Sequence, residues 1–160
     1  MKPFAAAAIA ALTASAASAA PEKLDMVGFF TGKTHGENVM KIALKKPSRL
    51  VVDSVGGKGD RGDFVLIDTV KEEGKPARQR KWIMRPAGPN RFTGTLSDAV
   101  GPVDVTISGD GALILYTMKG GLKVRQQMKL LDSRTLSNSV VVKKFGLKFA
   151  SVEGRIRKLD

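Results

Sequence analysis

The chain has 160 residues, no cysteine, and a formal net charge of +12 from 27 Lys and Arg against 15 Asp and Glu. The missing cysteines exclude a disulfide framework and thiolate metal ligands, and we expect no lipid-modified N-terminal cysteine. A positive field attracts polyanions. Outside the cytoplasm these are phospholipid headgroups, lipopolysaccharide and acidic glycans, so we expect no nucleic-acid partner. The alternative is that the lysines only keep a β-protein soluble and its strand edges unpaired.

The first 19 residues have the three features of a secretory signal peptide. Lys2 supplies a positive start, residues 4–12 form an alanine-rich apolar run, and Ala17-Ser18-Ala19 is an A-x-A cleavage site. The apolar run is shorter than the ~20 residues that a transmembrane helix requires. We therefore predict a signal peptide over residues 1–19 and a single exported domain over residues 20–160. That domain is expected in the periplasm or outside the cell, without a transmembrane segment.

After at most one short turn of helix ahead of Phe29, the pattern predicts strands separated by turns. Turn signals rich in glycine, proline and aspartate recur about every dozen residues, which is the spacing of hairpins. The segments between them are rich in Val, Ile, Thr and Phe. The turns are expected at residues 56–60, 73–76, 88–90, 109–111, 120–121 and 132–134.

Three segments alternate apolar and polar residues with the period of two that marks a half-buried antiparallel strand. In residues 122–130 the leucines, Val124 and Met128 share one face, while the lysines and the arginine take the other. Residues 103–108 and 148–157 repeat the pattern. The sequence therefore predicts an all-β, antiparallel up-and-down barrel of about 8–10 strands, because closing a barrel removes exposed edges. A β-sandwich is the alternative. A barrel of this size can hold one small ligand.

The sequence offers little support for an enzyme. His35 is the single histidine, in a polar segment where we expect it to be solvated. With no cysteine either, we expect no metal site and no cofactor. Residues 56–59 lack the spacing of a phosphate-binding loop, and no Gly-x-Ser-x-Gly elbow is present. Asp98, beside a glycine-rich corner, is the best candidate for acid–base chemistry in a hydrolase or isomerase. We prefer a structural pair between Asp98 and Arg80, and therefore expect a non-enzymatic protein.

Two groups of residues are better candidates for ligand binding. Residues 78–85 alternate so that Arg80 and Trp82 share a face. If this face points inward, Arg80 requires a carboxylate partner, because an unpaired buried charge is costly. If it points outward, Trp82 is an exposed aromatic among cations, which suits a headgroup or glycan surface. A third interpretation packs Trp82 in the core and lets the arginines extend to solvent.

The second group consists of polar residues set among apolar ones. Such residues orient a ligand in a cavity, or satisfy hydrogen bonds within a core. They are Tyr116, Gln126 and Asn138. The complete set of candidate ligand-binding residues is Arg80, Trp82, Asp98, Tyr116, Gln126 and Asn138.

Four short strings lie in order along nearly the whole of residues 20–160. They are Phe29-Phe30-x-Gly32, Arg80-Lys81-Trp82, Phe92-Thr93-Gly94-Thr95 leading to Asp98-Ala99-Val100-Gly101, and Asn138 followed by Lys144-Phe145-Gly146. Together they resemble the bacterial domain-of-unknown-function family 3833. The resemblance implies an envelope protein with a lipocalin-like or calycin-like barrel. Many members of that family are lipoproteins, whereas this chain lacks the lipobox cysteine and is expected to be free of an anchor.

The leading functional hypothesis is an exported, non-enzymatic binding protein. It is a carrier or sensor whose barrel holds a small apolar or amphipathic ligand, with the few polar groups of the interior orienting it. The alternative is a basic adaptor at the envelope surface, which binds anionic lipid, lipopolysaccharide or glycan through its exterior. The expected partners are thus a small lipophilic ligand or an anionic envelope surface.

Overall fold

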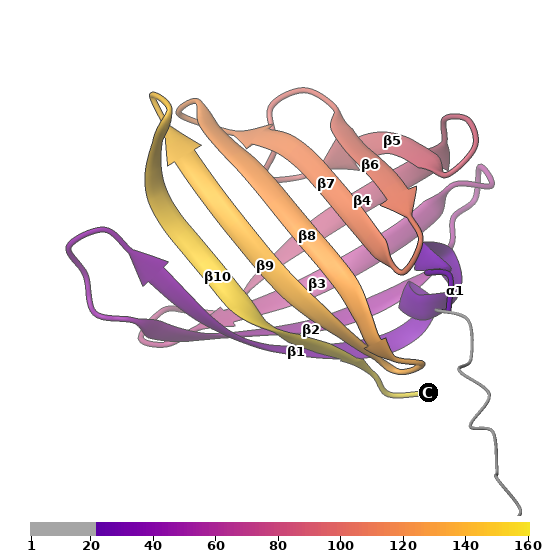
Figure 1. Cartoon of the computed structure of the whole chain (residues 1–160), viewed down its shortest axis with the longest axis horizontal. Coiled ribbons are helices and arrows are strands. Elements are labelled where there is room, and N and C mark those ends of the chain that lie inside the picture. Colours follow the sequence, from indigo (N-terminus) through magenta and orange to yellow (C-terminus); the bar gives the residue numbers. More distant parts are fainter. Residues whose placement is uncertain (1–21) are drawn as a thin grey trace, which may run out of the picture.

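The computed structural model describes residues 22–160 as a ten-stranded barrel with one short helix (Figure 1). The signal peptide predicted over residues 1–19 lies outside the described residues. The elements in chain order are α1 (Met26–Phe30), β1 (Gly32–Ile42), β2 (Ser48–Lys58), β3 (Phe64–Glu72), β4 (Arg78–Pro86), β5 (Arg91–Leu96), β6 (Val103–Ser108), β7 (Gly111–Met118), β8 (Leu122–Asp132), β9 (Thr135–Lys144) and β10 (Leu147–Lys158).

The barrel is a simple meander closed on itself. Each strand pairs antiparallel with its neighbours in the chain, and β1 pairs with β10 to complete the ring. This closing ladder extends from Thr34 opposite Lys158 to Ile42 opposite Ala150. The predicted antiparallel up-and-down barrel is confirmed, and the sandwich alternative is wrong.

The period-two pattern of the sequence sets which side chains enter the barrel. In β6, Val103, Val105 and Ile107 are buried and the residues between them are exposed. Tight turns join the strands, as at Gly120 and Gly121 between β7 and β8, where both residues have positive φ. Glycine adopts this conformation without the steric cost that a side chain would add.

The two ends of the barrel differ. One end carries the connections β1–β2, β3–β4, β5–β6, β7–β8 and β9–β10, and α1 lies at the opposite end (Figure 1). Toward the first of these ends, the interior is occupied by buried side chains of the hydrophobic core. The buried apolar side chains there are Leu96, Tyr116, Val124, Val142 and Ala150.

Helix α1 is fixed over its end of the barrel by specific contacts. Asp25 caps the helix, accepting a hydrogen bond from the Gly28 amide at 2.9 Å, and Lys158 Nζ donates to the Phe29 carbonyl at 3.2 Å. A Cβ atom at Gly56 would lie 2.1 Å from the Phe30 carbonyl oxygen. Glycine at this position of β2 therefore lets the helix sit close to the barrel. Within residues 22–160, no helix has the length and apolar character needed to cross a membrane.

Candidate functional site

A cavity of about 110 Å³ lies inside the barrel beneath α1. Its lining comes from α1 and from each of the ten strands. For scale, an apolar cavity of roughly 150 Å³ admits benzene. The space therefore suits a slender apolar group and is smaller than the roughly 300–1,000 Å³ of pockets that bind drug-sized molecules.

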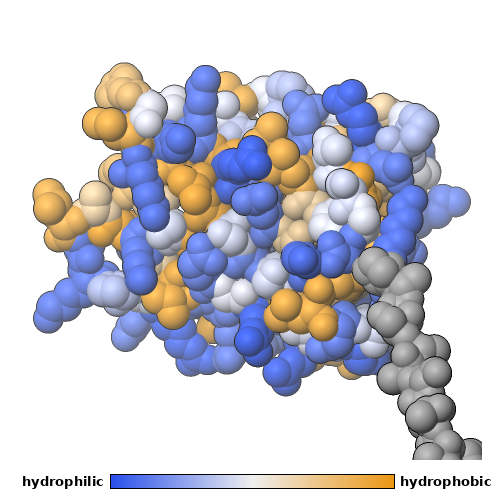
Figure 2. Space-filling model, in the orientation of Figure 1, coloured by the Kyte–Doolittle hydropathy of each residue, from blue (hydrophilic) through white to orange (hydrophobic). Residues whose placement is uncertain are grey.

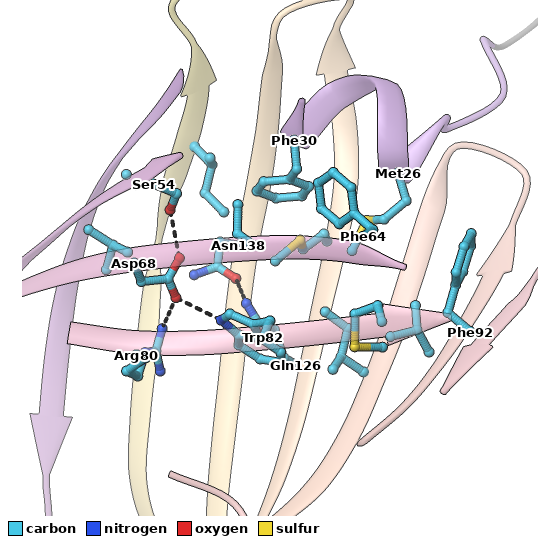
Figure 3. Close-up of a pocket in the computed structure, with 18 of the residues that line it drawn as sticks. Met26, Phe30, Ser54, Phe64, Asp68, Arg80, Trp82, Phe92, Gln126 and Asn138 are labelled. Atoms are coloured by element: carbon cyan, nitrogen blue, oxygen red, sulfur yellow. Dashed lines mark hydrogen bonds and ion pairs between the residues drawn. The ribbon is translucent and has the colours of Figure 1, made fainter. Parts of the chain in front are cut away.

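The part of the cavity nearest α1 is apolar (Figure 3). Met26 and Phe30 enter it from the helix, and Phe64 and Phe92 enter it from β3 and β5. Methionine side chains are flexible and fit irregular spaces, so this part of the cavity can adapt its shape. The apolar lining on this side comprises Met26, Val27, Phe30, Phe64, Leu66, Met84, Phe92 and Met128.

Met26 and Phe92 have a second role at the end of the barrel. Both also line a shallow depression on the outer surface, beside Lys23 and Arg91. These two apolar side chains therefore form part of the wall between the cavity and the outer depression.

The other part of the cavity is polar and is organised around Asp68, which is only 3% exposed. Its Oδ2 accepts hydrogen bonds from Arg80 Nη2 and Trp82 Nε1, both at 2.8 Å, and its Oδ1 accepts one from Ser54 Oγ at 2.7 Å. The strand register explains the cluster, because Ser54 lies opposite Asp68 and Asp68 lies opposite Arg80 on three adjacent strands. The buried carboxylate is thus both ion-paired and hydrogen-bonded, as a charge in a protein interior requires.

Arg80 is the most informative side chain in the polar part. It is held by Asp68 on one side and lies over the ring of Trp82, with its Cζ 5.6 Å from the ring centroid. Its Nε is buried and has no hydrogen-bond partner among the described residues. A buried donor without a partner costs free energy, and because Nε is covered by protein atoms, a ligand oxygen would reach it only after the surrounding side chains shift.

A chain of buried amides lies on the opposite wall. Gln126 Nε2 donates to Asn138 Oδ1 at 2.7 Å, and Asn138 Nδ2 donates to Asn38 Oδ1 at 3.0 Å. Asn138 is on β9 and Asn38 is on β1, with β10 between them. The two side chains meet across β10 at Gly154, where a Cβ atom would lie 2.5 Å from Asn38 Oδ1. Glycine at this position is required for the chain of amides.

Four of the six residues predicted from the sequence line the cavity. They are Arg80, Trp82, Gln126 and Asn138. Tyr116 lies behind Trp82 with the two rings edge to face, 5.7 Å apart between centroids, and it is not part of the lining. Burial raises the pKa of Tyr116 above its usual value.

The predicted pair between Arg80 and Asp98 is wrong. Arg80 pairs with Asp68, which is its direct neighbour across β3 and β4. Asp98 belongs to the β5–β6 connection, pairs there with Arg78, and does not line the cavity. The register of β4 thus places Arg78 toward the barrel rim and Arg80 one step further inside.

The sequence reasoning missed several cavity residues. Among them, Asp68 could have been predicted from the sequence, because it interrupts the apolar face that Phe64, Leu66 and Val70 form with a period of two. A single carboxylate on such a face requires a buried cation, and Arg80 is the matching cation. The missed polar residues and the glycine that accommodates them are Asn38, Ser54, Asp68 and Gly154.

Within residues 22–160, His, Asp and Glu side chains form no group of three that could hold a metal ion. His35, on the outer face of β1, donates or accepts a hydrogen bond with Asp53 at 2.6 Å and lies 3.6 Å from Glu37. This small exterior cluster also includes Lys71, whose Nζ lies 3.1 Å from Asp53. The cluster links side chains on the outer faces of β1, β2 and β3.

Comparison with known proteins identifies a family and a fold. Residues 4–158 match the family described as "Protein of unknown function (DUF3833)". The S-type phycobiliprotein lyase CPES from Guillardia theta has a similar structure, with a TM-score of 0.67 and 4% identity, over 84% of this chain and 90% of that one. A protein of unknown function from the DUF3598 family of Nostoc punctiforme has a TM-score of 0.66 and 12% identity, over 86% of this chain. This chain covers 50% of that protein. No curated protein matches the chain. At these identities the likeness is one of fold, a lipocalin-like barrel.

Proposed function

The chain belongs to the DUF3833 family, and we propose that it is an exported, non-enzymatic carrier or sensor that binds one small amphipathic ligand inside its barrel. The observation that carries this proposal is the two-part cavity. Its apolar part beneath α1 suits a hydrocarbon chain, and its polar part contains the side chains of Arg80, Gln126 and Asn138. The features of residues 1–19 support export.

The chemistry of the two parts indicates the class of ligand. The guanidinium of Arg80 donates hydrogen bonds, so a headgroup with oxygen acceptors, such as a carboxylate, fits the polar part. Asp68 pairs with Arg80, so the empty cavity contains no uncompensated charge from this residue. A slender chain fits the volume of about 110 Å³, and the methionines allow it to extend toward α1.

The hydrogen bonds and ion pairs of Asp68 and Asp98 support a non-enzymatic binding protein. A general base needs an oxygen free to take a proton from a substrate. Both oxygens of Asp68 accept hydrogen bonds from protein donors, and Asp98 pairs with Arg78 outside the cavity. Neither carboxylate is positioned to act on a molecule in the cavity.

Trp82 provides a direct test, since it is the single tryptophan of the chain and lines the cavity. We would titrate the exported protein with hexanoate, octanoate and decanoate, following Trp82 fluorescence. Affinity is expected to rise about fourfold per methylene until the cavity is full, because each buried CH₂ contributes ~0.8 kcal/mol. The alcohol of equal chain length should bind about tenfold more weakly, because an uncharged hydroxyl oxygen makes a weaker hydrogen bond to a guanidinium than a carboxylate does.

Val51 and Val52 offer a matched pair of variants on β2. Val52 lines the cavity, whereas Val51 is the next residue and faces outward opposite Glu37. Val52→Phe should fill the space and abolish the saturable signal, while Val51→Phe should leave it intact. Equal behaviour of the two variants, or no saturable signal with any of the acids, would refute the proposal. Native mass spectrometry of the purified protein would identify a ligand that remains bound.

A further inference from the structure

Two neighbouring hairpins project from the barrel end opposite α1. The β1–β2 connection spans residues 43–47, and the β9–β10 turn is formed by Phe145 and Gly146. The two hairpins lie side by side, because the Ala43 amide donates to the Phe149 carbonyl at 3.0 Å. We call their exposed residues the hairpin-tip surface. It comprises Leu44, Lys45, Lys46, Lys143, Lys144, Phe145, Leu147, Lys148 and Phe149.

Large apolar side chains stand fully in solvent on the hairpin-tip surface. Leu44 is fully exposed, Phe145 is 91% exposed and Leu147 is 75% exposed. Figure 2 shows hydrophobic side chains projecting at the left of the molecule, at the two hairpin tips, with hydrophilic side chains around them. Isolated exposed apolar residues are common, but a cluster at the most prominent point of a surface marks an interaction site.

The backbone conformation at the two tips is one that bulky apolar residues such as Leu44 and Phe145 rarely adopt. Phe145 has φ of 50° and Leu44 has φ of 63°, both in the left-handed region that bulky residues rarely adopt. Phe145 is followed by Gly146 with φ of 77°, so the turn is of the kind for which Asn-Gly is strongly preferred. Folding alone would favour Asn at the position of Phe145. Bulky apolar residues at exposed left-handed positions work against local folding preference, which points to a role in binding.

The charge of the hairpin-tip surface has one sign. The sequence contains no Asp or Glu in residues 41–49 or 141–152. Lys45, Lys46, Lys143, Lys144 and Lys148 form no ion pair within residues 22–160. Lys144 lies over the ring of Phe145, with its Nζ 5.6 Å from the centroid. The partner of such a surface is anionic.

We propose that the hairpin-tip surface docks the protein on an anionic lipid bilayer. Leu44, Phe145 and Leu147 enter the boundary between headgroups and acyl chains, and the lysines contact the anionic headgroups. The surface is convex and its apolar groups are at its tips, which suits insertion into a bilayer better than the concave fit of a folded protein partner. The α1 end, with Met26 and Phe92, then faces away from the membrane.

The test measures co-flotation of the exported protein with phosphatidylcholine vesicles that contain or lack phosphatidylglycerol. The wild type should bind the anionic vesicles, bind the neutral ones far more weakly, and dissociate as salt is raised. The double variant Leu44→Asn with Phe145→Asn should lose about tenfold or more in affinity, because apolar burial is lost. Its melting temperature should stay the same or rise, since asparagine suits both left-handed positions.

Charge variants at the two ends of the barrel give a matched control. Lys45→Gln with Lys144→Gln removes two cations from the hairpin-tip surface and should weaken binding about tenfold or more. Lys58→Gln with Arg61→Gln removes two cations at the α1 end, one from the last residue of β2 and one from the β2–β3 connection, and should have a far smaller effect. If the two double variants lost the same affinity for anionic vesicles, the binding would depend only on the overall positive charge of the protein. That result would overturn the proposal.

Two further outcomes would also overturn it. One is wild-type affinity of the Leu44→Asn, Phe145→Asn variant for anionic vesicles. The other is tip-dependent binding to polyglutamate without binding to vesicles, which would assign the surface to an acidic protein. The hairpin tips lie at the far end of the barrel from the cavity. Fatty-acid binding followed by Trp82 fluorescence should therefore be unchanged in every tip variant. Membrane docking can thus be refuted without refuting ligand binding in the cavity, and the reverse also holds.

Discussion

Replacing Asp68 by asparagine tests how the polar part of the cavity is held together. The change keeps the shape of the side chain and removes the charge that pairs with Arg80. The pair is largely buried, because the Asp68 side chain is 4% exposed and the Arg80 side chain is 19% exposed. Breaking a buried ion pair by removing one partner costs roughly 3–5 kcal/mol. The amide oxygen still accepts one hydrogen bond from Trp82 or Arg80, so we expect the lower bound, about 3 kcal/mol. For a domain of this size that lowers the melting temperature by about 10 °C.

Urea unfolding followed by far-UV circular dichroism measures this cost without depending on the environment of Trp82. Asp104→Asn is the matched control, because Asp104 faces outward from β6 and should change stability by no more than about 0.5 kcal/mol. A double-mutant cycle with Arg80→Met isolates the pair. In the Asp68→Asn protein, Arg80→Met should cost far less than it does in the wild type, because its partner is already gone. Additive effects, or equal stability of the Asp68→Asn and Asp104→Asn proteins, would refute the account.

Two further predictions concern the exterior and the amide chain. The hydrogen bond between Asp53 and His35 holds the pKa of Asp53 below its ordinary value of 3.8, so the carboxylate stabilises the fold above that pH and loses its contribution as pH falls through the lowered pKa. The difference in melting temperature between the wild type and Asp53→Asn should therefore shrink as the pH is lowered. A difference that grows on acidification would contradict this role of Asp53. Gly154→Ala should destabilise the protein by about 1–3 kcal/mol or more in the same urea assay, because its Cβ would lie 2.1 Å from the Glu37 carbonyl oxygen. Wild-type stability of that variant would show that β10 can move away from β1.

The architecture could be predicted from the sequence because a meander is a local pattern. Residues 103–108 and 122–130 alternate as β6 and β8 do in the structure, and residues 148–157 fall within β10. Turn signals at hairpin spacing then connect each strand to the next, and this order is the order around the barrel. The short helical turn expected ahead of Phe29 is α1, which includes Phe29 and covers the cavity.

The site was only partly predictable because its contacts depend on register between strands. The sequence indicates that an inward-facing Arg80 requires a carboxylate, but Asp68 and Asp98 are both near in sequence, and only the pairing of β3 with β4 selects Asp68. The sequence also shows Asn138 as a polar residue on an apolar face. Its partner Asn38 is 100 residues away, and no periodicity within one strand reveals that contact.

The closure of the barrel has a consequence for how the chain reaches its native state. Nine of the ten strand pairings join neighbours in the chain, whereas the tenth joins β1 to β10. Hairpins form quickly because their loops are short, but the last pairing brings together segments separated by most of the chain, which slows its formation. Until then, β1 and β10 present open edges to which other chains can add. Lys33 and Asp160 bond across this seam at 2.9 Å, so they help to hold shut the part of the barrel that forms last.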